Sequence, residues 1–590
     1  MPSEKTLGDF LSEKTIDHPH NGDNYLTLQC LRHLLTKPKV EENLDKYREQ
    51  SSRRNYTPNN PNGHYVQLIC PNSQAAEDKT YIRLFAALAT AEIGWLIFQF
   101  MDNGISDQDL PMAPPKDSSS TRLDNAFPQN IRRMNMDSFR IWKWKMNVPI
   151  LTWRRHMVFD QSVILPFIER TRSDPRTQTH TKDVGGHGEV SYLKIHKHGH
   201  DFPEIPQVTS PEGPFALKRI SRGGYGTTEG RRNREANMLE RFSPDVHAHI
   251  LTVLATYEHG DSHYIIFPWA KCDLDKYLKE NNNRSKDLAE KLEKVRWVAE
   301  QCLKITDAVH SIHIPRQNNE QQEEQLFGRH GDIKAENILA FGSEGQRPML
   351  VLSDFGLASV HHDWSKSNVP NQDLPVNPDV RPPECDMRGG TITRAFDIWT
   401  LGCLFLDLLS WLLMGENSRE QFKGKRKTRW FGGYTTSIYF EIVKHSETGK
   451  IGFIVKPVVT EWFATMHSHP RCTQFLHDFL DLIEQEMLIV GTESKKRMKT
   501  NGLLEKLNEL YVKCTRNEDY CTNGVPQQHR RTDTELLIAE AQLNDNILDL
   551  LQQPSAHLRT VSGRMERAEQ TRERYDTITI QMPSRSRTVW

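Results

Sequence analysis

The sequence predicts an α+β fold with two lobes, a small one rich in strands and a larger helical one, preceded by a mainly α-helical domain. Residues 1–170 contain amphipathic helical stretches, short strand-like runs follow from about residue 176, and long helical patterns dominate from about residue 287. Strands followed by helices within one segment are typical of the α+β class. The predicted domains are residues 1–170, residues 176–512 and residues 513–590.

The first of these domains is expected to be folded. Apolar residues recur at spacings of three and four in Tyr25–Leu35 and Tyr81–Met101, as in helices that pack together. Polar segments rich in Pro, Asn and Ser, Ser51–Gly63 and Asp107–Thr121, are expected to be loops. The large aromatic side chains of this region indicate a core: Trp95, Trp142, Trp144 and Trp153.

The strand-like runs are Val190–Ile195, Phe215–Ile220 and Tyr264–Phe267. The last domain, residues 513–590, is rich in Gln, Arg, Thr and Ser. We expect one helix there, Thr534–Leu551, and otherwise a largely disordered polar tail, because such a composition buries little apolar surface.

Composition excludes several classes of function. A net charge of −1 gives no basic surface for nucleic acid or an anionic membrane. The nine cysteines form no CxxC pair, which favours reduced thiols in an intracellular protein, cytoplasmic or nuclear. Two apolar runs, Leu84–Phe100 and Leu401–Met414, are each interrupted by an acid and fall short of the roughly 20 residues that span a bilayer. We expect a soluble protein that binds neither nucleic acid nor membrane.

The most informative motif is the run His330–Asn337, HGDIKAEN, followed by Asp354-Phe355-Gly356. It places a carboxylate, a lysine and an amide on one short loop and a second carboxylate shortly after. Transfer of a phosphoryl group from Mg-ATP needs a base for the incoming hydroxyl, a cation for the γ-phosphate and oxygen ligands for magnesium. The pattern resembles the catalytic and metal loops of eukaryotic serine/threonine protein kinases. The resemblance covers about residues 176–512 and implies the two-lobed protein-kinase fold.

The resemblance implies a role for each residue of these loops. Asp332 would accept or orient the proton of the substrate hydroxyl, and Lys334 would contact the γ-phosphate. Asn337 and Asp354 would hold Mg²⁺. The Asp-x-Lys spacing is that of serine/threonine rather than tyrosine kinases. Gly331 stands where the family usually has an arginine that pairs with an activation-loop phosphate, which argues against control by phosphorylation of that loop.

A second group of residues resembles the family's ATP pocket. Lys218, in the strand Ala216-Leu217-Lys218, would pair with the α- and β-phosphates, and Glu235 on the following helix would hold it, with Glu240 as the alternative. A glycine-rich loop before Val190 would cover the phosphates, because glycine lets backbone N–H groups approach phosphate oxygens. The residues of this loop are Val184, Gly185, Gly186, His187 and Gly188. Asp183 replaces the first glycine of the family pattern, and a simple glycine-rich turn is the alternative.

The remaining pocket residues follow from the same resemblance. Val190, Ala216 and Leu339 would sandwich adenine, and Phe267 would close the pocket behind it. The carbonyl of Pro268 and the N–H of Ala270 would bind the adenine edge, since proline lacks only the donor.

Three further elements match the family downstream. Arg381-Pro382-Pro383-Glu384 resembles its A-P-E element, and Asp397 begins a segment that resembles the buried helix anchoring the catalytic loop. Arg497 lies where the family places the partner of the A-P-E glutamate, so we expect a Glu384–Arg497 ion pair.

These motifs favour a serine/threonine protein kinase that uses ATP and Mg²⁺ and acts on protein substrates. A pseudokinase or scaffold is the alternative, favoured by Asp183 and Gly331. A kinase for a small molecule would lack Lys334 and the Pro-Pro-Glu element. The whole arrangement resembles a group of filamentous-fungal kinases, which implies no particular substrate. The N-terminal domain is expected to bind or regulate another protein or the kinase domain.

Overall fold

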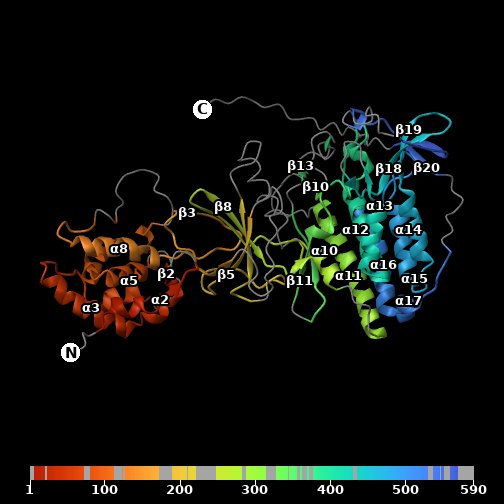
Figure 1. The fold of residues 1–590 in the computed structure, drawn as a ribbon. Coiled ribbons are helices and arrows are strands. Elements are labelled where there is room, and N and C mark those ends of the chain that lie inside the picture. The colour runs from red at the N-terminus through yellow and green to blue at the C-terminus, as the bar shows by residue number, and fades with distance from the viewer. Residues whose placement is uncertain are drawn as a thin grey trace, which may run out of the picture. The chain divides into compact units, whose positions relative to one another are not determined.

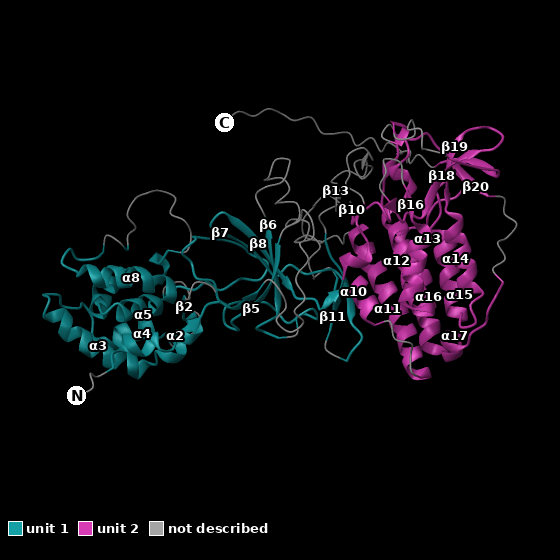
Figure 2. Ribbon diagram, viewed as in Figure 1, with its two compact units in different colours: residues 1–273, 339–356 teal, residues 274–338, 357–590 magenta. Residues whose placement is uncertain are grey.

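The computed structural model (Figure 1) describes residues 5–19, 23–71, 80–111, 123, 126–171, 189–208, 210–220, 247–281, 287–313, 327–342, 345–354, 359–361, 369–370, 377–429, 435–528, 536–544, 547–549 and 558–568. The chain divides into two compact units (Figure 2). Unit 1 consists of residues 1–273 and 339–356, and unit 2 of residues 274–338 and 357–590. Each unit is described by itself.

Unit 1 begins with a helical region built around one buried helix, α5 (Ile82–Thr90). Nearly every residue of α5 is buried, because helices surround it and leave no solvent face. The helices of this region are α1 (Leu7–Ser12), α2 (Leu28–Leu34), α3 (Lys37–Ser52), α4 (Asn62–Ile69), α5, α6 (Ile97–Asp102) and α8 (Arg133–Met146). The predicted helical character of Tyr25–Leu35 is confirmed for Leu28–Leu34, whereas Tyr25 belongs to strand β2 (Asn24–Tyr25). That of Tyr81–Met101 is confirmed, although this stretch breaks between α5 and α6 at a short 3₁₀ turn, Gly94–Leu96.

The rest of unit 1 contains a six-stranded sheet with the order β3-β7-β8-β6-β5-β4. Its strands are β3 (His156–Phe159), β4 (Phe167–Thr171), β5 (Glu189–Ile195), β6 (Phe215–Ile220), β7 (Ala255–His259) and β8 (Ser262–Pro268). The predicted strands are confirmed as β5, β6 and β8. Strands β3 and β4 precede the predicted boundary at residues 170–176 and pair with strands beyond it, β3 parallel to β7 and β4 antiparallel to β5. The sheet is therefore larger than the strand-like runs indicated, and the division into domains stays a prediction.

A second, three-stranded sheet of unit 1 has the order β12-β11-β9. Its strands are β9 (Cys272–Asp273), β11 (Ile338–Phe341) and β12 (Met349–Leu352). Short strand pairs elsewhere in the chain are β1 (Ile16–Asp17) with β2 (Asn24–Tyr25), β10 (Phe327–Arg329) with β13 (Ser359–His361), β14 (Val369–Pro370) with β15 (Thr391–Ile392), and β16 (Thr428–Arg429) with β17 (Thr435–Thr436).

Unit 2 is mainly helical, and α12 (Ala395–Met414) is its buried core helix. The other helices are α10 (Leu274–Glu280), α11 (Leu288–His313), α13 (Glu416–Arg426), α14 (Pro457–His467), α15 (Gln474–Leu482), α16 (Thr500–Arg516) and α17 (Glu518–Thr522). Among the described residues, α12 is the one helix long and apolar enough to span a membrane, so the apolar run is longer than the sequence reading allowed. Its most apolar window is 89% buried inside the protein, which accounts for the apolar composition.

The C-terminal region corrects one expectation. Strand β20 (Leu537–Glu540) lies within the stretch Thr534–Leu551 that was predicted to be a helix. It belongs to a five-stranded sheet of order β21-β18-β19-β20-β22, with β18 (Phe440–His445), β19 (Ile451–Val455), β21 (Arg559–Val561) and β22 (Arg564–Arg567). Val443, Ile454, Ile538 and Val561 form the apolar core of this sheet. Pairing with distant strands and burial of Ile538 outweigh the local helical pattern, because propensity is a weak determinant beside tertiary contacts.

Candidate active site

The loop His330–Asn337 is held to unit 2 by one buried carboxylate, Asp397 in the first turn of α12. One oxygen of Asp397 accepts the N–H of His330 and the other accepts the N–H of Gly331, each at 2.9 Å. His313, at the end of α11, lies with its Nε2 2.8 Å from the same carboxylate. The backbone at the start of the loop is thus fixed by Asp397. The side chains that follow, from Asp332 to Asn337, are positioned by contacts with one another.

His313 lowers the pKa of the Asp397 carboxyl. Burial alone would raise the pKa of Asp397, but the hydrogen bond and charge of His313 and the N–H of Gly331 outweigh burial, so the pKa lies below its ordinary value. Asp397 therefore remains a carboxylate and can accept from both N–H groups, as an anchor requires.

The backbone at Gly331 explains a departure from the family pattern. Its φ is +83°, in the left-handed region that glycine adopts without cost and side-chain-bearing residues disfavour. The glycine relieves strain at a position whose N–H is already committed to Asp397.

That residue, Asp332, has two oxygens in different environments. Oδ2 accepts a hydrogen bond from Nζ of Lys334 at 2.7 Å and from Nδ2 of Asn337 at 2.8 Å. The same amide nitrogen also donates to the backbone carbonyl of Asp332. Oδ1 is buried, and no described residue forms a hydrogen bond with it. One oxygen is therefore held in place while the other presents lone pairs, which suits a carboxylate that accepts the hydrogen of an incoming hydroxyl.

The predicted catalytic and metal residues of this loop come together as expected. Asp332, Lys334 and Asn337 lie within six consecutive residues that end in the 3₁₀ turn η3 (Ala335–Asn337), and Lys334 and Asn337 both donate to Asp332. Because Nδ2 of Asn337 faces Asp332, its amide oxygen lies on the opposite side of the amide group. Amide and carboxylate oxygens are the hard ligands that Mg²⁺ takes in proteins, so these residues fit that ion.

In unit 1, strands β5, β6 and β8 bring a second predicted set together. Lys218 on β6 lies opposite Val190 on β5 and Ile265 on β8, while Ala216 lies opposite Phe267. Residues two apart on a strand share a face, and directly opposite residues share it too. Val190, Ala216, Lys218 and Phe267 therefore occupy one face of the sheet.

The segment after β8 connects this sheet to β11. The N–H of Lys271 donates to the carbonyl of Ala340 at 3.0 Å, and Leu339 pairs with Asp273. Trp269 packs edge-on against Tyr192, with ring centroids 5.1 Å apart. Pro268 is buried at the end of β8, and Ala270 is partly exposed in the connection that follows. The hinge residues Pro268 and Ala270 and the wall residue Leu339 thus lie on connected parts of the same unit.

Asp354, the predicted second metal ligand, follows β12 by two residues. Its φ of +62° places it in the left-handed region, which is uncommon for a residue other than glycine but is tolerated by aspartate. Such backbone strain concentrates at functional sites, where it positions a side chain. Asp354 belongs to unit 1 and Asp332 to unit 2. The predicted residues Glu235 and Val184–Gly188 lie outside the described residues, as do Glu240 and Phe355.

The expected Glu384–Arg497 ion pair is confirmed. Arg497 donates two parallel hydrogen bonds, of 2.7 and 2.9 Å, to the two oxygens of Glu384. Arg497 also donates to the carbonyl of Ala395 and lies over the ring of Trp399. This bidentate, largely buried pair ties the Pro-Pro-Glu element to the start of α12, the helix that anchors the loop.

Sequence reasoning missed two residues of this region. His313 was not singled out, although a histidine in the last turn of a long amphipathic helix was a visible signal. Asp386, which forms an ion pair with the buried Arg381, was also missed, and its only signal was its place beside the Pro-Pro-Glu element.

Comparison with known proteins agrees with this geometry. Residues 208–486 match the protein kinase domain. Serine/threonine-protein kinase ICK of Mus musculus is 26% identical over 232 residues, which cover 38% of this chain and 32% of that protein. Cyclin-dependent kinase 8 of Drosophila melanogaster is 24% identical over 215 residues, covering 36% and 44%. Cyclin-dependent kinase E-1 of Arabidopsis thaliana is 25% identical over 204 residues, covering 34% and 40%.

The matched regions span less than half the length of each of these relatives. The catalytic motifs, the six-stranded sheet of unit 1, the helices of unit 2 and the family match nevertheless all indicate a protein kinase domain. Residues 208–486 therefore carry a protein kinase domain, which is similar to the domains of eukaryotic serine/threonine kinases.

Proposed function

We propose that this protein transfers the γ-phosphoryl group of ATP, with Mg²⁺, to serine and threonine hydroxyls of protein substrates. The observation that carries the proposal is the asymmetry of Asp332. Its Oδ2 is held by Lys334 and Asn337, while Oδ1 has no hydrogen-bond partner among the described residues. A nucleotide-binding scaffold has no need of a carboxylate positioned in this way.

In this mechanism the residues act mainly by positioning and by charge, as is general for phosphoryl transfer. Asp332 accepts the hydrogen of the substrate hydroxyl and orients its oxygen for in-line attack. The ammonium group of Lys334 lies beside Asp332, and it would contact both that carboxylate and the transferred phosphoryl group. Lys218 pairs with the α- and β-phosphates. Asn337 and Asp354 would hold Mg²⁺, which neutralises phosphate charge when bound.

The nucleotide would lie on the face of the sheet that carries Val190, Ala216 and Phe267. These three residues are apolar and Lys218 lies beside them on the same face, as adenine recognition followed by a phosphate contact requires. Ala270 would donate its N–H to the adenine edge, and Pro268 would offer its carbonyl. Leu339 would cover the other side of the ring.

The helical region of residues 5–146 is proposed to bind or regulate another protein or the kinase domain. It has its own apolar core of several helices, so it can present a fixed surface. Two of the relatives are named as cyclin-dependent kinases, that is, kinases that depend on a protein partner, which supports a search for a regulatory protein here.

The proposal is tested by incubating the full chain with radiolabelled Mg-ATP and myelin basic protein, followed by phosphoamino-acid analysis. We expect label on serine or threonine that is lost when EDTA removes Mg²⁺ and in Asp332→Asn. The variant Glu505→Gln, which removes an exposed charge on α16, should retain full transfer. Nucleotide binding without any transfer by the wild-type chain would contradict the proposal and favour the scaffold.

A further inference from the structure

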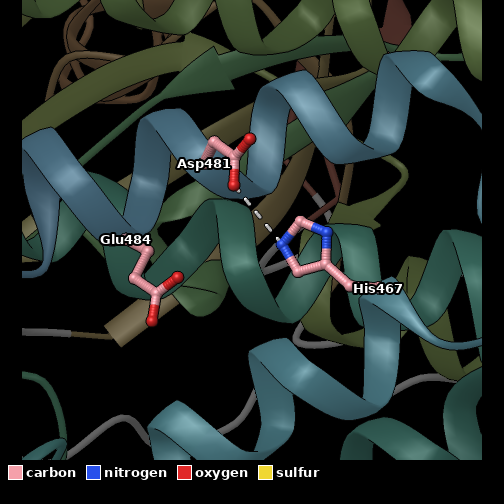
Figure 3. A group of neighbouring side chains, drawn as sticks. All are labelled: His467, Asp481 and Glu484. Atoms are coloured by element: carbon pink, nitrogen blue, oxygen red, sulfur yellow. Dashed lines mark ion pairs between the residues drawn. The ribbon is translucent and has the colours of Figure 1, made fainter. Parts of the chain in front are cut away.

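Two helices of unit 2 bring three metal-ligand side chains together away from the catalytic loop (Figure 3). His467 is the last residue of α14, Asp481 lies near the end of α15, and Glu484 lies in the π-helical turn η7 (Ile483–Met487) that continues α15. One ligand atom from each side chain lies within 4.8 Å of the other two. Nothing in the proposed phosphoryl transfer uses these residues.

A chain of hydrogen bonds fixes which nitrogen of His467 faces the carboxylates. Nε2 of His477 lies 2.7 Å from the carbonyl oxygen of Val525, and because a carbonyl only accepts, this nitrogen carries a hydrogen. In neutral His477 the other nitrogen, Nδ1, is then the acceptor. It lies 2.7 Å from Nδ1 of His467, which therefore donates.

His467 in turn presents the lone pair of Nε2. That atom lies 3.5 Å from a carboxylate oxygen of Asp481 (Figure 3). A metal ion between the lone pair of Nε2 and the carboxylate would be bound by both groups, whereas a proton on Nε2 would make the pair a His–Asp ion pair. Histidines that bind metals characteristically donate their other ring nitrogen to a second group, which sets the tautomer, and His477 occupies that position here.

The separation of the ligand atoms fits a small divalent ion. Ligand atoms about 2.0–2.2 Å from a tetrahedral zinc ion lie about 3.4 Å apart, close to the distance between His467 and Asp481. The ligand atom of Glu484 lies within 4.8 Å of the other two, so it must approach by at most about 1.4 Å, which rotation of its long, partly exposed side chain allows. An imidazole nitrogen with two carboxylates favours first-row transition metals over Mg²⁺ or Ca²⁺, which prefer oxygen alone.

The site is buried at its histidine end and accessible to solvent at its carboxylate end. His467 and His477 are buried, whereas the side chain of Asp481 is half exposed. The N–H of Gln527 donates to the carbonyl of His467, and the N–H of Val525 donates to the carbonyl of Cys472, so the segment after α17 holds the histidine end in place. The π-helical turn that carries Glu484 is a feature frequent at functional sites.

We propose that His467, Asp481 and Glu484 bind a divalent transition-metal ion of the zinc class, with a fourth position left to solvent, and that the ion joins α14 to α15. His477 is a positioning residue that sets the tautomer of His467. The site would be structural and independent of the proposed phosphoryl transfer.

The test is calorimetric titration of ZnCl₂ into the chelator-treated, dialysed full chain at pH 7, in the wild type and in Asp481→Asn and Glu484→Gln. Both carboxylates are partly exposed, so these variants should fold. Glu486→Gln is the matched control, since it removes a charge from the same π-helical turn but lies outside the ligand group. We expect one equivalent of zinc bound by the wild type and the control, at least 10-fold weaker binding in the two ligand variants, and no displacement by millimolar Mg²⁺.

A second readout follows the metal geometry itself. Cobalt substituted for zinc should give the visible absorption of a four-coordinate ion in the wild type, and Asp481→Asn should lose it. Zinc binding that is equal in the wild type and both ligand variants would place the ion elsewhere and overturn the proposal. Absence of zinc binding by the wild type would also overturn it, and would mean that a second proton on His467 faces Asp481 instead.

Discussion

Asp107 in the helical region and Asp397 at the start of α12 are both buried carboxylates that accept backbone N–H groups from a segment remote in sequence. Asp107 accepts from Leu84 and Arg83 at the start of α5 and from the hydroxyl of Thr80. Asp397 accepts from His330 and Gly331, with His313 beside it. Each satisfies donors that would otherwise be buried without partners.

The two carboxylates differ in the sign of their pKa shift. Burial dominates at Asp107 and raises its pKa, although the N–H of Leu84, the hydroxyl of Thr80 and the charge of Arg83 lower it in part. At Asp397 burial also acts to raise the pKa, but the hydrogen bond and charge of His313, the charge of His330 and the N–H of Gly331 together outweigh it, and the pKa is lowered. A buried carboxylate that binds backbone N–H groups thus has a raised pKa where it starts a helix and a lowered pKa where a histidine helps it to anchor the catalytic loop.

The largest expected effect is that of Asp397→Asn. Removing one partner of a buried hydrogen-bonded pair leaves the other buried without compensation, which costs about 3–5 kcal/mol. The side-chain NH₂ group of the new asparagine would also face the N–H of His330 or Gly331, so that two donors would meet and one backbone hydrogen bond would be lost. We expect a loss of this order in the free energy of unfolding of unit 2, measured by urea denaturation, together with a loss of phosphoryl transfer.

Asp107→Asn should cost less. Within the described residues no imidazole is paired with this carboxylate, and the amide oxygen can keep one backbone hydrogen bond, so a loss of about 1–2 kcal/mol is expected for the helical region. Urea denaturation followed by hydrogen exchange of α5 would measure it. A cost equal to that of Asp397→Asn would remove the distinction between the two carboxylates.

Gly331→Ala should cost about 1 kcal/mol, because a β-carbon is disfavoured at a φ of +83°. Gly424→Ala is a suitable comparison, since that glycine lies in α13 at an ordinary helical φ with open space around it, and alanine should be neutral or stabilising there. Thermal denaturation of both variants separates the two cases. A neutral Gly331→Ala would mean that the loop backbone differs from the conformation described.

The smallest expected effect is on pH dependence, and it has opposite signs at the two carboxylates. The lowered pKa of Asp397 stabilises the fold fully above the unfolded-state value of about 3.9, and this contribution is lost as the pH falls through the folded-state pKa. The raised pKa of Asp107 makes its ionised form a cost, which is relieved as the pH falls from neutrality toward about 3.9.

Denaturation between pH 7 and pH 3 should therefore show two trends. The wild type should lose its advantage over Asp397→Asn below about pH 4 and gain stability relative to Asp107→Asn as the pH falls toward 4. Parallel trends in both comparisons would contradict the assigned directions.

Sequence predicted much of the catalytic loop because its residues act within a few positions of one another. Asp332, Lys334 and Asn337 form their contacts across two to five residues. The pair Glu384–Arg497 is distant in sequence but was predicted from the family pattern, and it is present. Strands β5, β6 and β8 carry the apolar alternation that makes strands visible locally.

The features that sequence did not predict depend on long-range pairing. Strand β3 is short and exposed on alternate residues, and its partner β7 lies about 100 residues away. Strand β20 has local helical character, and only its pairing with β19 and β22 makes it a strand. His313 and Asp397 meet across 84 residues, and His467 reaches Asp481 only because two helices pack together. No local spacing encodes such contacts.

The central claim is that Asp332 makes this domain an active kinase. The most direct measurement is the rate of phosphoryl transfer by Asp332→Asn at saturating Mg-ATP, with ATP affinity measured on the same preparation. Loss of a positioned base typically lowers the rate by about 10²–10⁴-fold. The account predicts a loss of at least this size with ATP affinity within a few-fold of wild type, and transfer at the wild-type rate by Asp332→Asn would contradict it.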